Sequence, residues 1–163
     1  MKKINKKMEE TLLKLKKFNR NEILNIRFKE LIELLYPSFV QVYDCIIISK
    51  KSSAELESSF LKEVREGYPN EKALYEYDKN ETLINLCFEE KISRNASIII
   101  GLKALKAWGA ILKQIEPRSK FWMVLSCDRK YVMLRFHKLR MGEEFILGEI
   151  DDIDQPVYCE LIE

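Results

Sequence analysis

Residues 119–140 read SKFWMVLSCDRKYVMLRFHKLR. Two runs rich in aromatic, β-branched and other apolar residues, Phe121–Ser126 and Tyr131–Leu139, flank the short polar segment Asp128–Lys130. Two such runs joined by a few polar residues predict a β-hairpin. We therefore expect the sheet of this protein to be built on this hairpin.

The segment before the hairpin, Ser93–Glu116, has the pattern of a core helix. Ser93 or Asn95 can cap its first turn by accepting a backbone N–H bond. Gly101 and Gly109 lower helix propensity, and we expect them to allow close packing of the helix on the sheet. Apolar side chains recur at helical spacing and define one face, Ile98, Leu102, Leu105, Leu112 and Ile115, which is widened by Ile99, Trp108 and Ile111.

Three amphipathic helices are predicted in the first part of the chain. Asn5–Phe18 carries apolar side chains at spacings of three and four, with lysines on its other faces. A second stripe, Leu24, Phe28, Leu31 and Leu35, stops at Pro37. Ser52 or Ser53 can cap a third helix over Ala54–Glu66, with Leu56, Phe60, Leu61 and Val64 pointing inward.

The remaining apolar runs are typical of strands. Ser38–Ser49 contains Cys-Ile-Ile-Ile and predicts a strand that is buried on both faces. Leu74–Tyr77 and Thr82–Phe88 flank a four-residue polar loop and predict a second hairpin, and Pro156 opens a last strand, Val157–Ile162.

These elements together predict one α+β domain over residues 1–163. Helices occupy residues 1–36, and a mainly antiparallel sheet with its core helix occupies residues 38–163. The helix Ser93–Glu116 should cover a sheet made of Val40–Ile48, Phe121–Ser126, Tyr131–Leu139 and Val157–Ile162.

Composition favours a soluble globular protein, because 47% of the 163 residues are hydrophobic and 33% are charged. Uninterrupted apolar runs of only a few residues argue against a membrane-spanning helix and a membrane partner. The basic start Met1–Lys7 lacks the apolar core of a signal peptide, so we expect a cytoplasmic protein. The net charge of +2 disfavours a nucleic-acid module on bulk charge alone.

The four cysteines are widely separated and form no Cys-x-x-Cys pair. A zinc site shows closely spaced pairs, and a disulfide scaffold is shorter and richer in loops. We therefore expect four reduced, mostly buried thiols, and no bound metal or other cofactor, at Cys45, Cys87, Cys127 and Cys159.

Charge is distributed unevenly between the two ends. Residues 1–20 hold eight Lys and Arg against two Glu, whereas Glu143–Glu163 holds eight Asp and Glu and no Lys or Arg. The ends could attract one another, each could face a separate partner, or both could be solvated.

Catalytic chemistry has little basis in the sequence. His137 is the single histidine and shares a strand face with Arg135, which predicts either a clamp for a phosphate or partner carboxylate or an ordinary pair at a sheet edge. Ser126 and Cys127 lack a nucleophile elbow, and the five glycines form no phosphate-binding loop. Asp152 could open a calcium loop, but Val157 stands where the loop needs glycine. We expect a protein that is not an enzyme.

The last third of the chain resembles bacterial immunity proteins of polymorphic and contact-dependent toxin systems. The likeness rests on LRFHKLRMGEE at residues 134–144, followed by the acidic turn Asp152–Asp154 and by Pro156 with Val157. The resemblance implies a small cytoplasmic α+β protein that binds a cognate toxin and neutralises it without catalysis.

An acidic surface would be steered towards the basic cleft of a nuclease-type toxin. The expected partner-binding residues are the acidic set and the strand pair: Glu143, Glu144, Asp151, Asp152, Asp154, Arg135 and His137. A homo-oligomer is compatible with this prediction. The alternatives are a nucleic-acid-binding or regulatory module, using the basic N-terminal helix and the Arg135/His137 strand face, and a small enzyme of unrecognised type.

Overall fold

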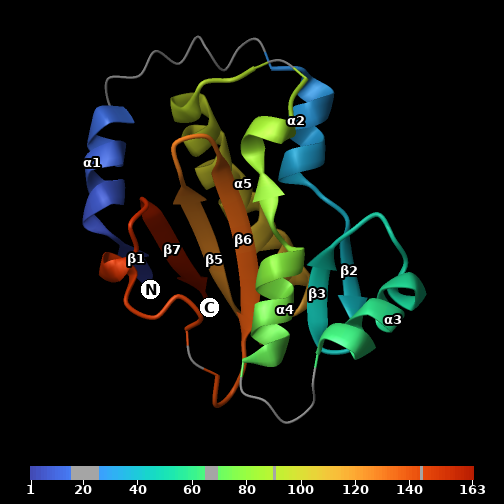
Figure 1. The fold of residues 1–163 in the computed structure, drawn as a ribbon. Helices are drawn as coiled ribbons and strands as arrows, with labels where there is room; N and C mark the ends of the chain where they lie inside the picture. Colours follow the sequence, from blue (N-terminus) through green and yellow to red (C-terminus); the bar gives the residue numbers. More distant parts are fainter. Residues whose placement is uncertain (16–25, 65–69, 90, 144) are drawn as a thin grey trace.

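A computed structural model describes residues 1–15, 26–64, 70–89, 91–143 and 145–163 of the chain. Its main element is an antiparallel five-stranded sheet in the order β1-β7-β5-β6-β4 (Figure 1). The strands are β1 (Lys2–Ile4), β4 (Thr82–Leu83), β5 (Lys120–Cys127), β6 (Val132–Leu139) and β7 (Val157–Ile162). The α+β class, the mainly antiparallel sheet and the covering helix are thus confirmed.

The predicted hairpin is the pair β5–β6, which runs in register from Lys120 opposite Leu139 to Cys127 opposite Val132. The Asp128 carboxylate closes the turn by accepting the backbone N–H groups of Lys130 and Tyr131. An aspartate that bonds to the backbone two and three residues later replaces the Asn-Gly pair that the sequence lacks. On its other side β5 pairs with β7, and β7 pairs with β1.

Helix α5 (Arg94–Ile115) lies across one face of this sheet, capped by Ser93 as predicted (Figure 1). Its glycines allow the close approach: a Cβ at Gly101 would lie 2.9 Å from Cδ1 of Leu125. A Cβ at Gly109 would lie 3.1 Å from Cγ1 of Ile162. Contrary to the expectation from short apolar runs, α5 is long and apolar enough to cross a membrane, but 56% of its apolar window is buried inside the fold. It is the core helix of a soluble protein.

The N-terminal helices are α1 (Lys6–Leu15) and α2 (Phe28–Leu35). Leu34 of α2 is buried against α5, and its carbonyl oxygen accepts the indole N–H of Trp108 at 2.8 Å. Phe28, predicted to face inward, is 76% exposed. Leu24 lies outside the described residues.

The prediction of one strand over Val40–Ile48 in the main sheet is wrong. This segment folds back on itself as β2 (Phe39–Val42) and β3 (Cys45–Ile48), a separate two-stranded sheet. Tyr43 adopts a positive φ of 51° at the turn, and Asp44 follows it. A Tyr-Asp pair is a poor turn signal, so the continuous apolar pattern masked the reversal.

The predicted hairpin over Leu74–Tyr77 and Thr82–Phe88 is also wrong. The first run belongs to helix α4 (Glu71–Lys79), and only Thr82 and Leu83 of the second form a strand, β4. Helix α4 lies between the two sheets and buries Ala73, Tyr75, Glu76 and Tyr77. A helix buried on several sides loses its amphipathic period, and two tyrosines then favour a strand by propensity alone.

The third predicted helix is confirmed as α3 (Ser53–Glu63) with a capping box between Ser52 and Glu55. Leu56 and Phe60 are buried as expected, and Val64 follows the helix as a buried residue. Leu61 differs from the prediction, since it is 66% exposed.

Candidate protein-binding face

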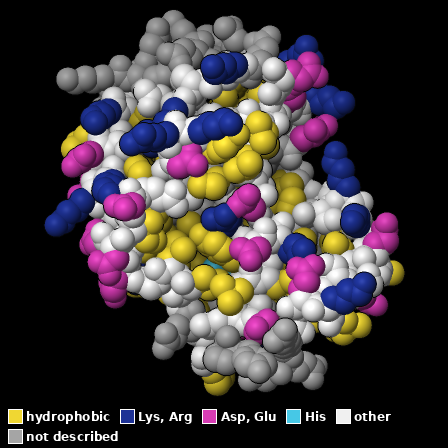
Figure 2. Space-filling view, viewed as in Figure 1, with side chains coloured by type: hydrophobic (Ala, Val, Ile, Leu, Met, Phe, Trp, Pro, Cys, Tyr) yellow, Lys and Arg dark blue, Asp and Glu magenta, His cyan; other side chains and the backbone are white. Residues whose placement is uncertain are grey.

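The sheet face opposite α5, here called the front face, carries every second side chain of the central strands. Phe121, Met123, Leu134 and Phe136 point into the core with α5. Their neighbours point to the front face, where Trp122, Val124, Val157, Cys159 and Leu161 form a second apolar cluster with Tyr77 of α4. Leu139, Phe145, Ile146, Leu147 and Ile153 pack against this cluster and remain only partly buried. The front face is therefore covered by a loop segment and one helix, with apolar side chains still reaching solvent (Figure 2).

Arg135 projects from β6 on this face. Its guanidinium lies 4.7 Å from the centre of the Tyr77 ring and donates to the Tyr77 hydroxyl at 3.3 Å. It also forms an ion pair with Glu81. Its Nε is buried without a hydrogen-bond partner among the described residues. These contacts fix the orientation of Arg135 and leave one donor unused.

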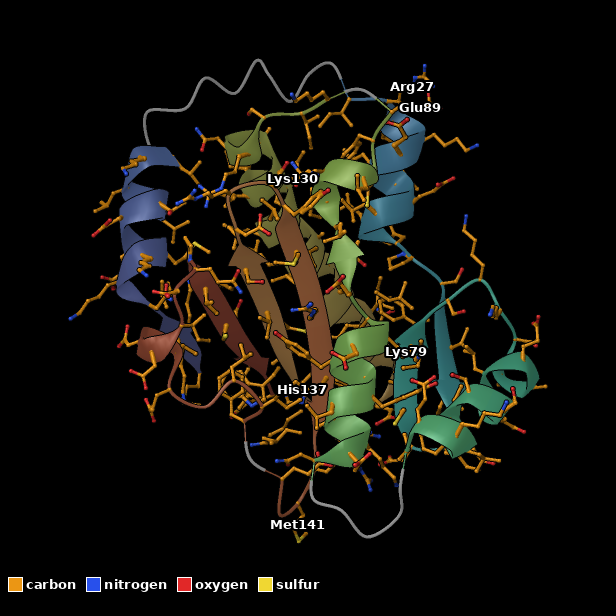
Figure 3. The ribbon with its side chains drawn as sticks, in the orientation of Figure 1. Arg27, Lys79, Glu89, Lys130, His137 and Met141 are labelled. Carbon is orange, nitrogen blue, oxygen red and sulfur yellow. The ribbon has the colours of Figure 1, made fainter. Side chains whose placement is uncertain are left out.

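His137 lies further along β6, on the same face, but only 1% of it is exposed (Figure 3). Its ring packs between Tyr77 and Phe145, with ring centres 6.3 and 6.4 Å away. Nδ1 lies 3.3 Å from the carbonyl oxygen of Lys138, and Nε2 has no partner in the described part of the chain. The interpretation of His137 as part of a partly exposed edge pair is wrong, because β4 and α4 flank β6 on that side.

Burial lowers the pKa of His137 from 6.5 to about 4, so the folded protein keeps this imidazole neutral. Because the folded-state pKa lies below the unfolded one, the unfolded chain binds the extra proton between these two pH values. We expect the free energy of unfolding to fall by up to about 3 kcal/mol as pH drops from 6.5 to 4. Urea denaturation at several pH values measures this fall.

His137→Leu is the matched variant for this experiment, since leucine does not titrate and suits an apolar site. Other groups near the imidazole, including Arg140 and Lys138, are shared by both proteins and cancel in the comparison. The variant should lose less stability over the same pH range. Parallel pH profiles for the two proteins would show that His137 is not the titrating group.

Residues 149–154, here called the acidic segment, lie beside the basic N-terminus, so the two oppositely charged ends of the chain contact each other. Asp154 forms an ion pair with Lys7 at 2.9 Å, and the Asp151 carboxylate accepts the backbone N–H of Lys6 at 3.4 Å. Asp152 is exposed and takes part in no such bond within the described ranges. Of the other predicted acidic residues, Glu143 is mostly buried and forms an ion pair with Arg140 at 3.6 Å. Glu144 lies outside the described residues.

Asn5 connects these two ends, and the sequence pattern did not single it out. Its side chain is 1% exposed and donates to the carbonyl oxygens of Ile150 and Gln155 at 3.2 and 2.8 Å. Its Oδ1 accepts the backbone N–H groups of Met8 and Val157, each at 3.0 Å. One amide therefore begins α1 and positions the acidic segment.

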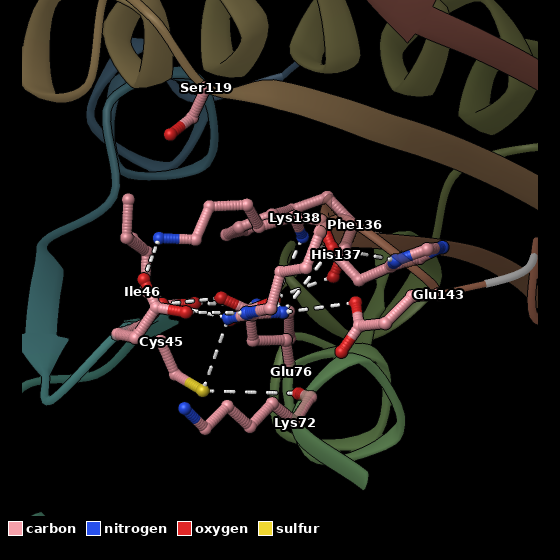
Figure 4. A network of polar contacts seen from close by, with 12 residues as sticks. Cys45, Ile46, Lys72, Glu76, Ser119, Phe136, His137, Lys138 and Glu143 are labelled. Atoms are coloured by element: carbon pink, nitrogen blue, oxygen red, sulfur yellow. Dashed lines mark hydrogen bonds and ion pairs between the residues drawn. The ribbon is translucent and has the colours of Figure 1, made fainter. Parts of the chain in front are cut away.

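A buried polar network joins the end of β6 to its surroundings (Figure 4). Lys138 forms ion pairs with Asp44 at 2.5 Å and with Glu116 at 2.9 Å. Arg140 forms ion pairs with Asp44 at 2.7 Å and with Glu76 at 3.0 Å. Asp44, Glu76 and Glu116 lie too far off in sequence for local patterns to pair them with these two basic residues.

Glu76 of α4 and Asn80, the residue that follows the helix, link the small sheet to the large one. The Glu76 carboxylate accepts the backbone N–H groups of Ile46 on β3 and Lys138 on β6, each at 2.8 Å. Asn80 accepts the N–H of Ile48 at 2.7 Å and donates to the carbonyl oxygen of Ile46 at 2.9 Å. Burial raises the pKa of Glu76, while Arg140 and the two N–H donors oppose that rise. The side chains of Glu76 and Asn80 thus replace backbone pairing between the two sheets.

The four cysteines are free thiols, of which Cys45, Cys127 and Cys159 are buried and Cys87 is half-buried. Burial raises the pKa of Cys45 to about 12 and that of Cys127 to about 11, which keeps both protonated at neutral pH. Among the described residues no group of three or more His, Cys, Asp and Glu side chains is placed to hold a metal ion.

Comparison with known families adds one finding. The model of the Uncharacterized protein PM0498 family matches residues 3–162. The chain belongs to this family. The match runs from β1 to the end of β7, so family membership extends over the N-terminal helices and both sheets. No curated protein and no solved structure matches the chain.

Proposed function

We propose that this protein is an immunity protein that binds a cognate bacterial toxin through the front face and neutralises it without catalysis. The observation that carries the proposal is Arg135, held by Tyr77 and Glu81 among partly exposed apolar side chains on that face. Arginine and aromatic residues within an apolar surface are the groups that most often dominate the binding energy of protein interfaces.

The apolar part of the proposed interface comes from the segment that crosses the front face. Phe145, Ile146, Leu147 and Ile153 contact the buried cluster yet stay partly accessible. The Phe145 ring lies 4.3 Å from that of Trp122, which fixes this segment on the sheet. A preformed surface loses little conformational entropy when it binds, and this favours tight association.

Fewer acidic side chains are free to bind a partner than the sequence predicted. Asp151 and Asp154 already bond to the N-terminal segment, whereas Asp152 and Glu149 are exposed without a partner among the described residues. These two free carboxylates are the ones that can attract a basic toxin cleft.

The double variant Glu149→Gln, Asp152→Asn tests this steering. We expect it to slow association with the toxin domain encoded next to this gene by about 10-fold at low salt. The difference should shrink as salt rises, because screening weakens attraction between exposed charges. Surface plasmon resonance over a series of salt concentrations measures both effects.

Glu33→Gln with Glu57→Gln is the matched control, since it removes two exposed carboxylates from α2 and α3 instead. Equal slowing by both double variants would assign the effect to net charge and would remove the acidic segment from the interface. Failure of the unaltered protein to bind any neighbouring toxin domain would contradict the proposal itself.

The nucleic-acid alternative has weaker geometric support. Lys7 is paired with Asp154, and His137 is buried. Two of the groups on which that alternative depended are therefore committed to contacts within the protein.

A further inference from the structure

A pocket of about 740 Å³ lies where the β5–β6 turn meets the start of α5 and the loop before β7. Arg94 and Arg129 line it, together with Asp128, Ile153, Asp154 and Pro156. Lys130 marks the same turn in Figure 3, and Figure 2 shows Lys and Arg side chains gathered over that part of the front face. The pocket is separate from Arg135 and from the polar network around Glu76, and it shares Ile153 with the proposed toxin interface.

The negative charges of this pocket already have partners. Asp154 is paired with Lys7 at 2.9 Å. The Asp128 carboxylate accepts the backbone N–H groups of Lys130 and Tyr131, and these bonds hold its pKa below the usual value. Both carboxylates therefore have hydrogen-bond or ion-pair partners within the protein.

The two arginines form no direct ion pair with a described residue, and Asp128 attracts Arg94 only at longer range. Arg94 donates from Nε to the carbonyl oxygen of Asp128 at 3.1 Å, which anchors its guanidinium at the pocket. Its two terminal nitrogens, and the whole guanidinium of Arg129, make no ion pair with any residue that the structure describes. Among the described residues, the pocket groups that still have free hydrogen-bond donors are therefore the guanidinium groups of Arg94, on α5, and Arg129, in the β5–β6 turn.

The geometry points to a binding site for a small molecule that carries a phosphate group on an organic body. Two guanidinium groups offer several charge-assisted donors to one phosphate, an arrangement that arginine suits better than lysine. The volume of about 740 Å³ exceeds what a bare phosphate fills and lies within the usual range for organic ligands. Ile153 and Pro156 supply an apolar wall for the organic part. This site goes beyond toxin binding and does not depend on it.

Calorimetry with three probes tests the assignment: adenosine monophosphate, inorganic phosphate and adenosine. We expect the nucleotide to bind most tightly, because it alone satisfies both the arginines and the apolar wall. The double variant Arg94→Gln, Arg129→Gln should weaken nucleotide binding by about 10-fold or more. Thermal unfolding of this variant without ligand shows whether its fold is intact.

Lys103→Gln with Lys106→Gln is the matched control, because it removes two charges from the exposed side of α5. This control should bind the nucleotide as the unaltered protein does. Absence of nucleotide binding by the unaltered protein, equal affinity for adenosine and its monophosphate, or equal weakening by both double variants would each overturn the assignment.

Discussion

Replacing Glu76 with alanine is expected to lower the free energy of unfolding by about 3–5 kcal/mol, the usual cost of removing one partner from a buried ion pair. Glu76 is fully buried, and its carboxylate accepts two backbone N–H groups and one from Arg140. Alanine would leave the two backbone N–H groups without an acceptor, whereas Arg140 would keep the carbonyl oxygen of Lys138 but lose its buried countercharge. Urea denaturation followed by circular dichroism measures the loss.

Glu57→Ala provides the comparison, since Glu57 is exposed on α3 and its removal should change stability by less than about 0.5 kcal/mol. A loss below about 1 kcal/mol for Glu76→Ala would mean that the small sheet is held to β6 by other contacts. The account of Glu76 and Asn80 as substitutes for backbone pairing would then be wrong.

Trp108→Ala is expected to cost about 3–5 kcal/mol, in line with other large-to-small changes in protein cores. Trp108 is 1% exposed and packs edge-on against Phe136, with ring centres 6.3 Å apart. Its indole N–H also satisfies the buried carbonyl oxygen of Leu34, so the variant loses both packing and a hydrogen bond.

Trp108→Phe separates the two losses. It keeps most of the apolar volume and removes the hydrogen bond, so it should cost roughly 1–3 kcal/mol. A loss below about 1 kcal/mol for the alanine variant, measured by the same denaturation experiment, would show that α5 does not lie in the core.

Local sequence patterns predicted the centre of this fold because its elements obey local rules. The hairpin β5–β6, the strand β7 and the capped helix α5 each carry a regular period and a clear boundary. The local pattern was misleading where tertiary contacts decide the secondary structure. Helix α4 lies between two sheets, and its tyrosines then favoured a strand.

The candidate site was predicted in part. Arg135 and His137 share one face of β6, as strand alternation indicated, but nothing local showed that Phe145 would cover His137. Asn5 bonds to a residue 145 positions away, and Glu76 bonds to one 62 positions away. Such side-chain bonds to distant backbone groups leave no period in the sequence, so only the structure shows them.

The proposed function is that the front face binds and neutralises a toxin. It is tested by titrating a toxin domain, if one is encoded beside this gene, with the protein and following toxin activity. We expect full inhibition at an equimolar ratio, and we expect folded Arg135→Ala to need at least about 100-fold more protein for the same inhibition. Full toxin activity at excess protein would contradict the proposed function, and equal inhibition by the Arg135→Ala variant would contradict the placement of the interface.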